Sequence, residues 1–410
     1  MQPTLLGVVE SLNTFKICKL TRVHVIMATA VVKDVNAYLS AKQLSAPQEL
    51  ADDWALLEEY HNKKLWHQLT LKLHSFVENE NLQKGTELIE LYNNFIQVFE
   101  NKINPLALVE IVAHITPHYT EPKEALTFLE TIESRVKGNS EAVALAKVLQ
   151  GNILLQRLND LDATKKIIDD VEQILDEADG ITTVHGRYYL LASKYFRQKG
   201  HHADYYRTAL RYLGCIEVSD LSLSEQVQHA FFLGLAALLG EGVYNLGELL
   251  AHPVLNSLKG TNNVWLVDLL FAFNTGDIAK FEAMKPKWRE VPDLVAHEIK
   301  LRQKISLLCL MEMTFKRASN KRELTFAEIA KATRLPMDEV ELLVMKALAQ
   351  GLVKGAIDQV AGSVHMTWVQ PRVLNKQQIS SMVERLNVWC KEVQDMEALL
   401  EDKGHDFLTL

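Results

Sequence analysis

Few residues in this sequence combine the types and the spacing that catalysis, cofactor binding or metal ligation requires. Gly240-Glu241-Gly242 matches the start of a dinucleotide-binding loop, but Asn245 stands where the third glycine belongs, and a helical pattern precedes it. His67 and His74 lie on one helical face with no acid beside them, unlike the ligand set of a zinc site. The motifs GxxxxGKS/T, GxSxG and HExxH do not occur. The sequence therefore predicts a protein that is not an enzyme, without catalytic residues, cofactor or metal.

Positive charge is most concentrated in residues 187–211. Six basic residues stand there against Asp204 as the sole acid, and tyrosines interleave with them from Tyr188 to Tyr212. Basic residues among aromatic rings can bind RNA through phosphate contacts and base stacking. The tyrosines also follow helical spacing, which favours packing between helices, and the acidic segment 160–179 could neutralise the charge. We therefore favour a protein interface or a solvated face, and expect no nucleic-acid partner.

Length and composition predict a folded protein of more than one domain. The chain has 410 residues, of which 48% are hydrophobic and 23% charged, and its formal charge is 44 − 52 = −8. Its four cysteines are widely spaced and form no CxxC pair, so neither a disulfide framework nor a zinc knuckle is expected. No run approaches the roughly 20 apolar residues that cross a bilayer, so no membrane partner is expected.

The first 47 residues are predicted to be an N-terminal extension. Residues 1–26 contain Lys16, Lys19 and Arg22 against one acid, Glu10, a composition that also resembles a mitochondrial transit peptide. We favour an extension in which residues 1–26 lie outside the fold and the folded protein starts near Met27.

Residues 48–290 are predicted to form an α-solenoid of helix hairpins. Apolar residues recur at helical spacing, as in Leu88, Leu91, Tyr92, Phe95 and Phe99. Each helix therefore has one apolar stripe that must be buried against neighbours. Short polar turns, at 138–140, 158–160, 199–201 and 275–277, favour antiparallel neighbouring helices.

Residues 291–374 are predicted to form a winged-helix module. A first helix over 299–315 is followed by a capping box, Thr325-Phe326-Ala327-Glu328, which opens a short helix. A second helix starts at Pro336, and two extended runs, 352–357 and 364–369, form a β-hairpin. The second helix carries three acids before its single lysine, a charge that disfavours duplex DNA as the ligand.

Residues 375–410 are predicted to form a long C-terminal helix and a tail. Its apolar positions alternate in steps of three and four, which is an a/d seam. The seam consists of Ile379, Met382, Leu386, Trp389, Val393, Met396 and Leu400. Such a seam needs a partner helix, from this chain or another.

Several of these runs carry a family resemblance. The segments 324–330, 339–348 and 351–355 closely resemble the PCI module, which is shared by the proteasome lid, the COP9 signalosome and translation initiation factor 3. The segments 63–70, 238–245 and 365–374 narrow the resemblance to the lid subunits of the proteasome regulatory particle, in the non-ATPase regulatory subunit 13 family.

The resemblance implies a non-catalytic scaffold in the cytoplasm and nucleus, which supports assembly of the complex that degrades ubiquitinated proteins. It also implies a hetero-oligomer, whose partners are other PCI-containing lid subunits and the lid helical bundle. The expected interface residues are Val353, Ile357, His365 and Met366 in the wing and the seam of the C-terminal helix. The alternatives are a PCI subunit of the signalosome or initiation factor 3, or a nucleic-acid-binding winged-helix protein.

Overall fold

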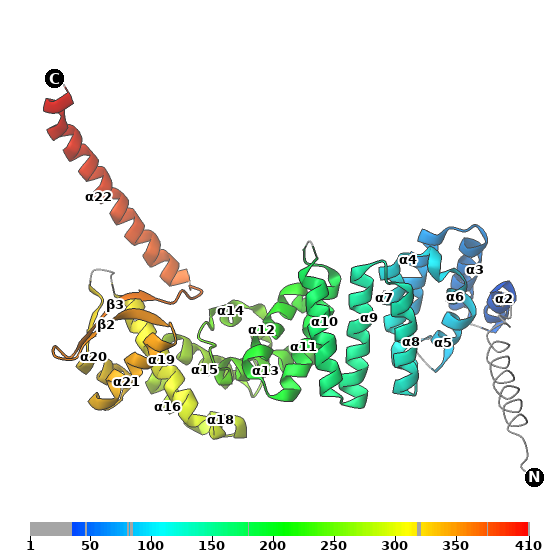
Figure 1. Ribbon diagram of the computed structural model, residues 1–410, viewed down its shortest axis with the longest axis horizontal. Helices are drawn as coiled ribbons and strands as arrows, with labels where there is room; N and C mark the ends of the chain where they lie inside the picture. The colour runs from blue at the N-terminus through cyan, green and yellow to red at the C-terminus, as the bar shows by residue number, and fades with distance from the viewer. Residues whose placement is uncertain are drawn as a thin grey trace, which may run out of the picture. The chain divides into compact units, whose positions relative to one another are not determined.

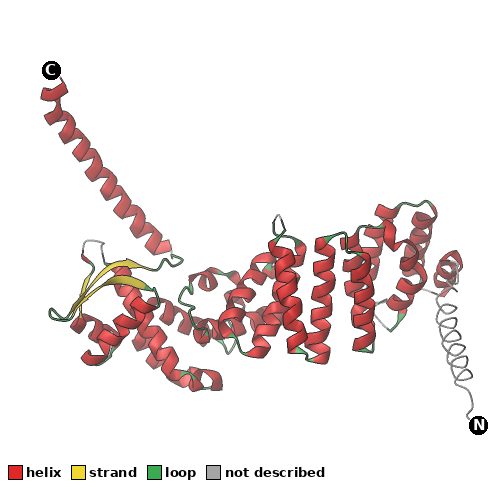
Figure 2. Ribbon diagram, viewed as in Figure 1, coloured by secondary structure: helices red, strands yellow, loops and turns green. Residues whose placement is uncertain are grey.

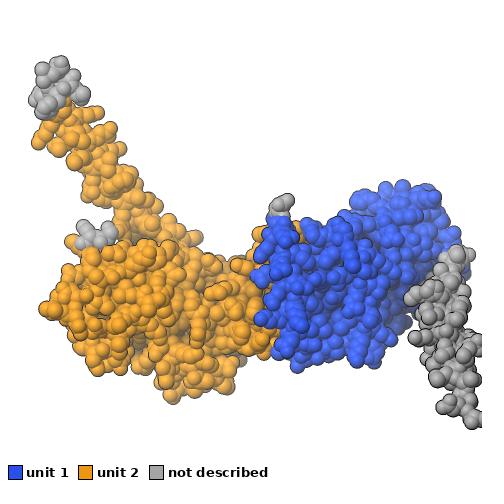
Figure 3. Space-filling model, in the orientation of Figure 1, with its two compact units in different colours: residues 1–180 blue, residues 181–410 orange. Residues whose placement is uncertain are grey.

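The computed structural model describes residues 35–45, 47–79, 82, 85–178, 180–317, 321–374 and 376–408. The chain divides into two compact units, residues 1–180 and 181–410 (Figure 3). The predicted extension over residues 1–26 and its boundary at Met27 lie outside the described residues.

Helices joined by short turns build unit 1 (Figures 1 and 2). The helices are α2 (Val35–Ser45), α3 (Gln48–Asn62), α4 (Trp66–Val77), α5 (Glu87–Leu91), the π-helical η1 (Tyr92–Ile96), α6 (Gln97–Phe99), η2 (Glu100–Lys102), α7 (Pro105–Ile115), η3 (Thr116–His118), α8 (Pro122–Arg135), α9 (Ser140–Ile153), the π-helical η4 (Leu154–Leu158) and α10 (Leu161–Asp176).

The apolar stripes and the turn residues explain this arrangement. All five members of the stripe from Leu88 to Phe99 are buried. Asn139 and Asp160 cap α9 and α10, because their side chains accept hydrogen bonds from the amides of Ala142 and Ala163 at 3.0 and 2.9 Å. Antiparallel packing of neighbouring helices then buries one stripe against the next.

Among the residues that the structure describes, α2 precedes residue 48, where the sequence interpretation starts the helical array. Leu39 of α2 is fully buried, and Tyr38 packs edge-on against Trp54 of α3 with 6.1 Å between ring centroids. Residues 35–45 thus belong to the packed helices of unit 1.

Unit 2 starts with helices and ends with a small sheet and a long helix. Its helical part comprises α11 (Thr183–Lys199), α12 (His202–Cys215), η5 (Val218–Asp220), α13 (Leu223–Leu239), α14 (Gly247–Ala251), η6 (Pro253–Leu258), α15 (Val264–Thr275), α16 (Ile278–Ala283), α17 (Lys285–Trp288) and α18 (Pro292–Ala296). The following elements are α19 (Glu298–Lys316), β1 (Glu323–Thr325), α20 (Phe326–Thr333), α21 (Met337–Ala349), β2 (Val353–Asp358), β3 (Ser363–Val369) and α22 (Lys376–Leu408).

The predicted winged helix is present, with one strand more than expected. Thr325 and Glu328 form the predicted capping box at the start of α20. β1 adds to the hairpin and gives an antiparallel sheet of order β1-β3-β2. Leu324 of β1 lies opposite Val364 of β3, and both side chains are fully buried. The predicted fold class, mainly α with a winged-helix module and a long C-terminal helix, is therefore confirmed.

A glycine fixes the register of the hairpin. The pairing between β2 and β3 shifts between Lys354 and Gly355. A Cβ atom at Gly355 would lie 2.2 Å from the carbonyl oxygen of His365, closer than any side chain allows. Only glycine fits there, which is a common role of glycine beside a β-bulge.

Candidate protein-interaction surfaces

The sheet of the winged-helix module has β1 and β2 as its edge strands. β3 is the central strand, because it pairs with β1 on one side and with β2 on the other. The amide of Met366 donates to the carbonyl of Arg322 at 2.9 Å, on the β1 side, so the amide of the preceding residue, His365, faces β2. His365 lies opposite Ala356, so the amide and carbonyl of Ile357, one residue further along β2, face away from the sheet.

The four predicted wing residues have different surroundings. Val353 and Met366 are buried in the module core, with 1% and 0% of their surface exposed. Ile357 is half-buried on the edge strand, and His365 is exposed on the central strand. The structure therefore leaves the side chain of His365 and the outer edge at Ile357 free for contact, whereas Val353 and Met366 support the wing from inside.

The helix α21, which follows α20 in the winged-helix module, has an exposed apolar face. Met337, Leu342 and Met345 are 53%, 64% and 51% exposed. Between α19 and α21 lies a groove of about 620 Å³, lined by Ile299 and Leu342 among other residues. A DNA-reading helix would carry basic residues on this face, so the observed side chains fit a protein surface better than phosphate.

The seam of α22 is open to solvent along its whole length. Figure 2 shows α22 as one uninterrupted helix. The seven seam residues are 43–62% exposed, with Met382 the least and Leu400 the most exposed. Between residues 376 and 404 no side chain is buried. Exposed apolar residues in one continuous stripe mark an interaction site more often than scattered ones do.

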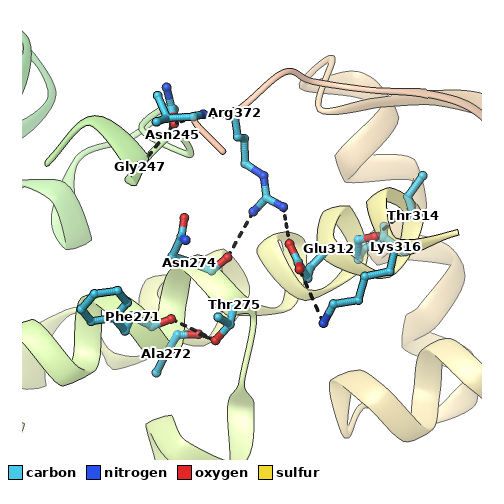
Figure 4. A network of polar contacts seen from close by, with 12 residues as sticks. Asn245, Gly247, Phe271, Ala272, Asn274, Thr275, Glu312, Thr314, Lys316 and Arg372 are labelled. Atoms are coloured by element: carbon cyan, nitrogen blue, oxygen red, sulfur yellow. Dashed lines mark hydrogen bonds and ion pairs between the residues drawn. The ribbon is translucent and has the colours of Figure 1, made fainter. Parts of the chain in front are cut away.

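A polar network holds the segment that connects β3 to α22. Figure 4 shows Arg372 of this segment directed toward Glu312 of α19. The two side chains form an ion pair and are only 8% and 9% exposed, and Arg372 also donates to the carbonyl of Asn274 at 3.2 Å. Next to it, a Cβ atom on Gly247 would lie 2.6 Å from the Cβ of Val373, so the connecting segment packs closely on α14. This segment is therefore anchored to the helices of unit 2.

A buried lysine of α19 binds the carbonyl groups at the C-terminal end of α13. The Nζ atom of Lys304, on α19, donates to the carbonyls of Ala237, Leu238 and Gly240 at 2.7, 3.2 and 2.8 Å. These carbonyls have no partner within their own helix, and a cation suits the negative end of the helix dipole. Burial lowers the pKa of Lys304 from 10.5 to about 7. Lys304 thus has a structural role in joining α13 to α19.

The basic stretch 187–211 does not form a base-stacking platform. Five of the tyrosines that accompany it are buried, with 2–8% of their surface exposed, namely Tyr188, Tyr195, Tyr205, Tyr206 and Tyr212. Single-stranded RNA binding by stacking needs exposed rings. The tyrosines pack between helices, as their helical spacing predicts.

The residues that the structure describes offer neither a metal site nor a helix that spans a membrane. They contain no group of three or more His, Cys, Asp or Glu side chains that could hold a metal ion. None of the described helices is both long and apolar enough to cross a membrane.

Two protein-family models match adjoining parts of the chain. Residues 53–270 match the family model of PSD13 N-terminal repeats, and residues 279–368 match the PCI domain. The fold, with a helical array followed by a winged helix, is thus that of the PCI-domain proteins.

Three curated relatives are similar over nearly the whole chain. The 26S proteasome non-ATPase regulatory subunit 13 homolog B of Arabidopsis thaliana is 38% identical and covers 91% of this chain and 98% of its own. The 26S proteasome non-ATPase regulatory subunit 13 of Dictyostelium discoideum is 36% identical, over 88% and 95%. The 26S proteasome regulatory subunit RPN9 of Saccharomyces cerevisiae is 34% identical, over 90% and 98%. The chain belongs to the 26S proteasome non-ATPase regulatory subunit 13 family.

Proposed function

We propose that this protein is a non-catalytic scaffold subunit of the lid of the proteasome regulatory particle. The observation that carries the proposal is the open seam of α22, in a chain whose family is that of proteasome regulatory subunits. A subunit that only positions others needs surfaces for partners and no reacting groups. The family membership does not favour the signalosome or initiation-factor alternative.

Two kinds of contact would join the protein to its neighbours. α22 would pack with helices of other lid subunits in a shared bundle, since a narrow a/d stripe suits helix–helix packing. The outer edge of β2 would extend its sheet with backbone from another PCI subunit, because an edge strand has unpaired amides and carbonyls. In this proposal residues 48–290 form the helical array, 291–374 the PCI module and 375–410 the bundle helix, and the protein acts in the cytoplasm and nucleus.

Affinity purification of the tagged full chain followed by mass spectrometry tests the proposal. We expect proteasome lid subunits and the proteasomal ATPases among the recovered proteins. Recovery of ribosomes and initiation-factor subunits in their place would contradict it.

A further inference from the structure

Three helices of unit 2 line a small cavity that includes no residue of the winged helix or of α22. It has a volume of about 180 Å³ and lies between α11, α12 and the start of α13. Lys194 and Arg197, one turn apart on α11, contribute two cations to its lining, and Tyr205, Tyr212 and His229 complete the polar wall. The rings of Tyr212 and His229 are in contact, with 5.6 Å between their centroids.

Neither of the two cations in this cavity forms an ion pair with a described carboxylate, although Glu225 lies in the same lining and interacts with Lys194 at longer range. Lys194 is half-buried and forms neither an ion pair nor a hydrogen bond with any residue that the structure describes. Arg197 is exposed, lies over the ring of Phe232 at 4.9 Å and likewise forms no ion pair with a described carboxylate. The one carboxylate in the lining, Glu225, accepts hydrogen bonds at 3.1 and 2.7 Å from the backbone and hydroxyl of Ser222, which it caps at the start of α13.

The pKa shifts of the cavity side chains indicate that positive charge is in excess there. Burial and the neighbouring Arg197 lower the pKa of Lys194, and Glu225 only partly opposes them. Burial, Arg197 and Lys194 lower the pKa of His229 in the same way, again against Glu225. Cations that disfavour each other's charge in a partly desolvated site are stabilised by an anion between them.

Further hydrogen-bond donors line the same space. The hydroxyls of Tyr205 and Tyr212 form no hydrogen bond with any described residue, although the side chains are only 5% and 8% exposed. Together with Lys194, Arg197 and His229, side chains that carry hydrogen-bond donors thus line the cavity from all three helices. Donors from several directions suit a group with oxygens on several sides.

We propose that this cavity binds the phosphate group of a phosphate monoester. Such a group carries a charge of about −1.5 to −2 and three strong acceptor oxygens, which match the two cations and the surrounding donors. A nucleic-acid phosphodiester is disfavoured, because the accompanying tyrosines are buried and cannot stack on bases. The monoester is either a phosphorylated side chain of a protein or a small soluble phosphate compound.

The test is calorimetric titration of the full chain with inorganic phosphate in a phosphate-free buffer that contains about 0.15 M sodium chloride, where exposed charges more than about 8 Å apart are largely screened. We expect millimolar or tighter binding, weakened about tenfold or more by Lys194→Gln, which removes a hydrogen bond between charged groups. The matched control is Arg207→Gln, which removes one positive charge from the same basic stretch. Arg207 is exposed, pairs with Asp204 at 3.7 Å and does not line the cavity, so its loss should change the affinity less than about twofold.

Absence of binding by the unaltered chain to both inorganic phosphate and a phosphoserine peptide, or equal weakening in the two variants, would overturn the proposal. Misfolding is not expected to confuse the result. Lys194→Gln removes a half-buried charge that burial and Arg197 disfavour more than Glu225 favours it, so it should not lower the melting temperature. As a second measurement, NMR of the His229 ring should show its pKa rising when phosphate is added to the unaltered chain, and no such rise in Lys194→Gln.

A peptide with one phosphoserine separates the two sources of the ligand. Tighter binding of this peptide than of inorganic phosphate, with no binding of the unphosphorylated peptide, would assign the site to a phosphorylated protein segment. Equal or weaker binding of the peptide would assign it to a small phosphate compound.

Discussion

The buried lysine on α19 makes the stability of the protein depend on pH. The unfolded chain titrates Lys304 near 10.5, whereas burial lowers its pKa in the folded chain to about 7. Between these values the unfolded chain holds a proton that the folded chain has released. The free energy of unfolding therefore rises with pH, by up to about 1.4 kcal/mol per unit, and is constant below pH 7 as far as this group is concerned.

Replacing Lys304 with methionine isolates this contribution. The difference in melting temperature between the unaltered chain and Lys304→Met should shift in favour of the unaltered chain as pH rises from 7 to about 10. Thermal unfolding at a series of pH values measures it. A difference that does not vary with pH would mean that the lysine stays charged in the folded chain.

Arg372 and Glu312 form the second residue-scale test. Arg372→Met leaves Glu312 buried, with Lys316 at 3.5 Å as its remaining ion-pair partner among the described residues. Removing one member of a buried pair costs about 3–5 kcal/mol, whereas replacing both by apolar side chains of similar size is often close to neutral. We therefore expect the double variant Arg372→Met with Glu312→Met to recover most of the stability that the single variant loses in denaturant unfolding. A double variant as unstable as the single one would contradict the pairing.

Neither the burial of Lys304 nor the pairing of Arg372 with Glu312 could be predicted from the sequence. Lys304 stands in a helix-period pattern where a lysine is usually solvated, and its acceptors come from a helix more than 60 residues earlier in the chain. The cations of the α11 cavity were visible as a basic stretch, but spacing along one helix does not reveal which other helices face it. Local pattern predicts which residues share a face, and tertiary packing decides what that face meets.

At the scale of elements, proline substitutions on the edge strand and on the central strand of the sheet can be compared for their effects on assembly and on stability. Ile357→Pro removes an amide that faces away from the sheet, and proline is tolerated on edge strands. It should leave the melting temperature close to that of the unaltered chain and weaken association with a neighbouring subunit that adds a strand there. Native gel analysis of reconstituted assemblies measures the association.

His365→Pro is the comparison variant, because His365 lies on the central strand of the sheet. Its amide faces β2 inside the sheet, so proline there should destabilise the module itself and not only its contacts. A stable Ile357→Pro variant that assembles normally would count against the β2 edge as an interface.

The sheet also shows which elements of the module could be predicted from sequence patterns and which could not. The hairpin runs 352–357 and 364–369 correspond to β2 and β3 within one residue, and the capping box placed α20 correctly. β1 was missed because its three residues are too few to show an alternating pattern, and its partner strand comes almost 40 residues later. As a consequence, the prediction of His365 as an interface residue of the wing did not take into account that it lies on the central strand.

At the scale of the whole molecule, the seam of α22 decides between an internal and an external partner. The sequence left both possible, because an a/d pattern does not say which helix fills it. In the structure Leu386 and Val393 remain 55% and 47% exposed, so this chain's own described residues do not bury the seam. Burying a side chain of this kind contributes about 1.5–3 kcal/mol, which is a gain that only association supplies here.

Replacing Leu386 and Val393 with aspartate should therefore affect assembly and not folding. Two carboxylates in a closed seam would be desolvated without partners, at a cost that association could not offset, whereas in the isolated chain both positions are solvated. We expect an unchanged melting temperature for the isolated double variant, loss of incorporation into the assembled complex, and loss of any concentration-dependent self-association that the open seam causes.

The matched control changes Asn387 and Gln394 to aspartate, which adds the same charge one residue further along, outside the seam. Sedimentation of each chain alone and of the reconstituted complex measures these effects. A clearly lowered melting temperature of the isolated seam variant would show that α22 packs on its own unit, and equal loss of incorporation in the control would show that charge on α22, and not its seam, controls assembly.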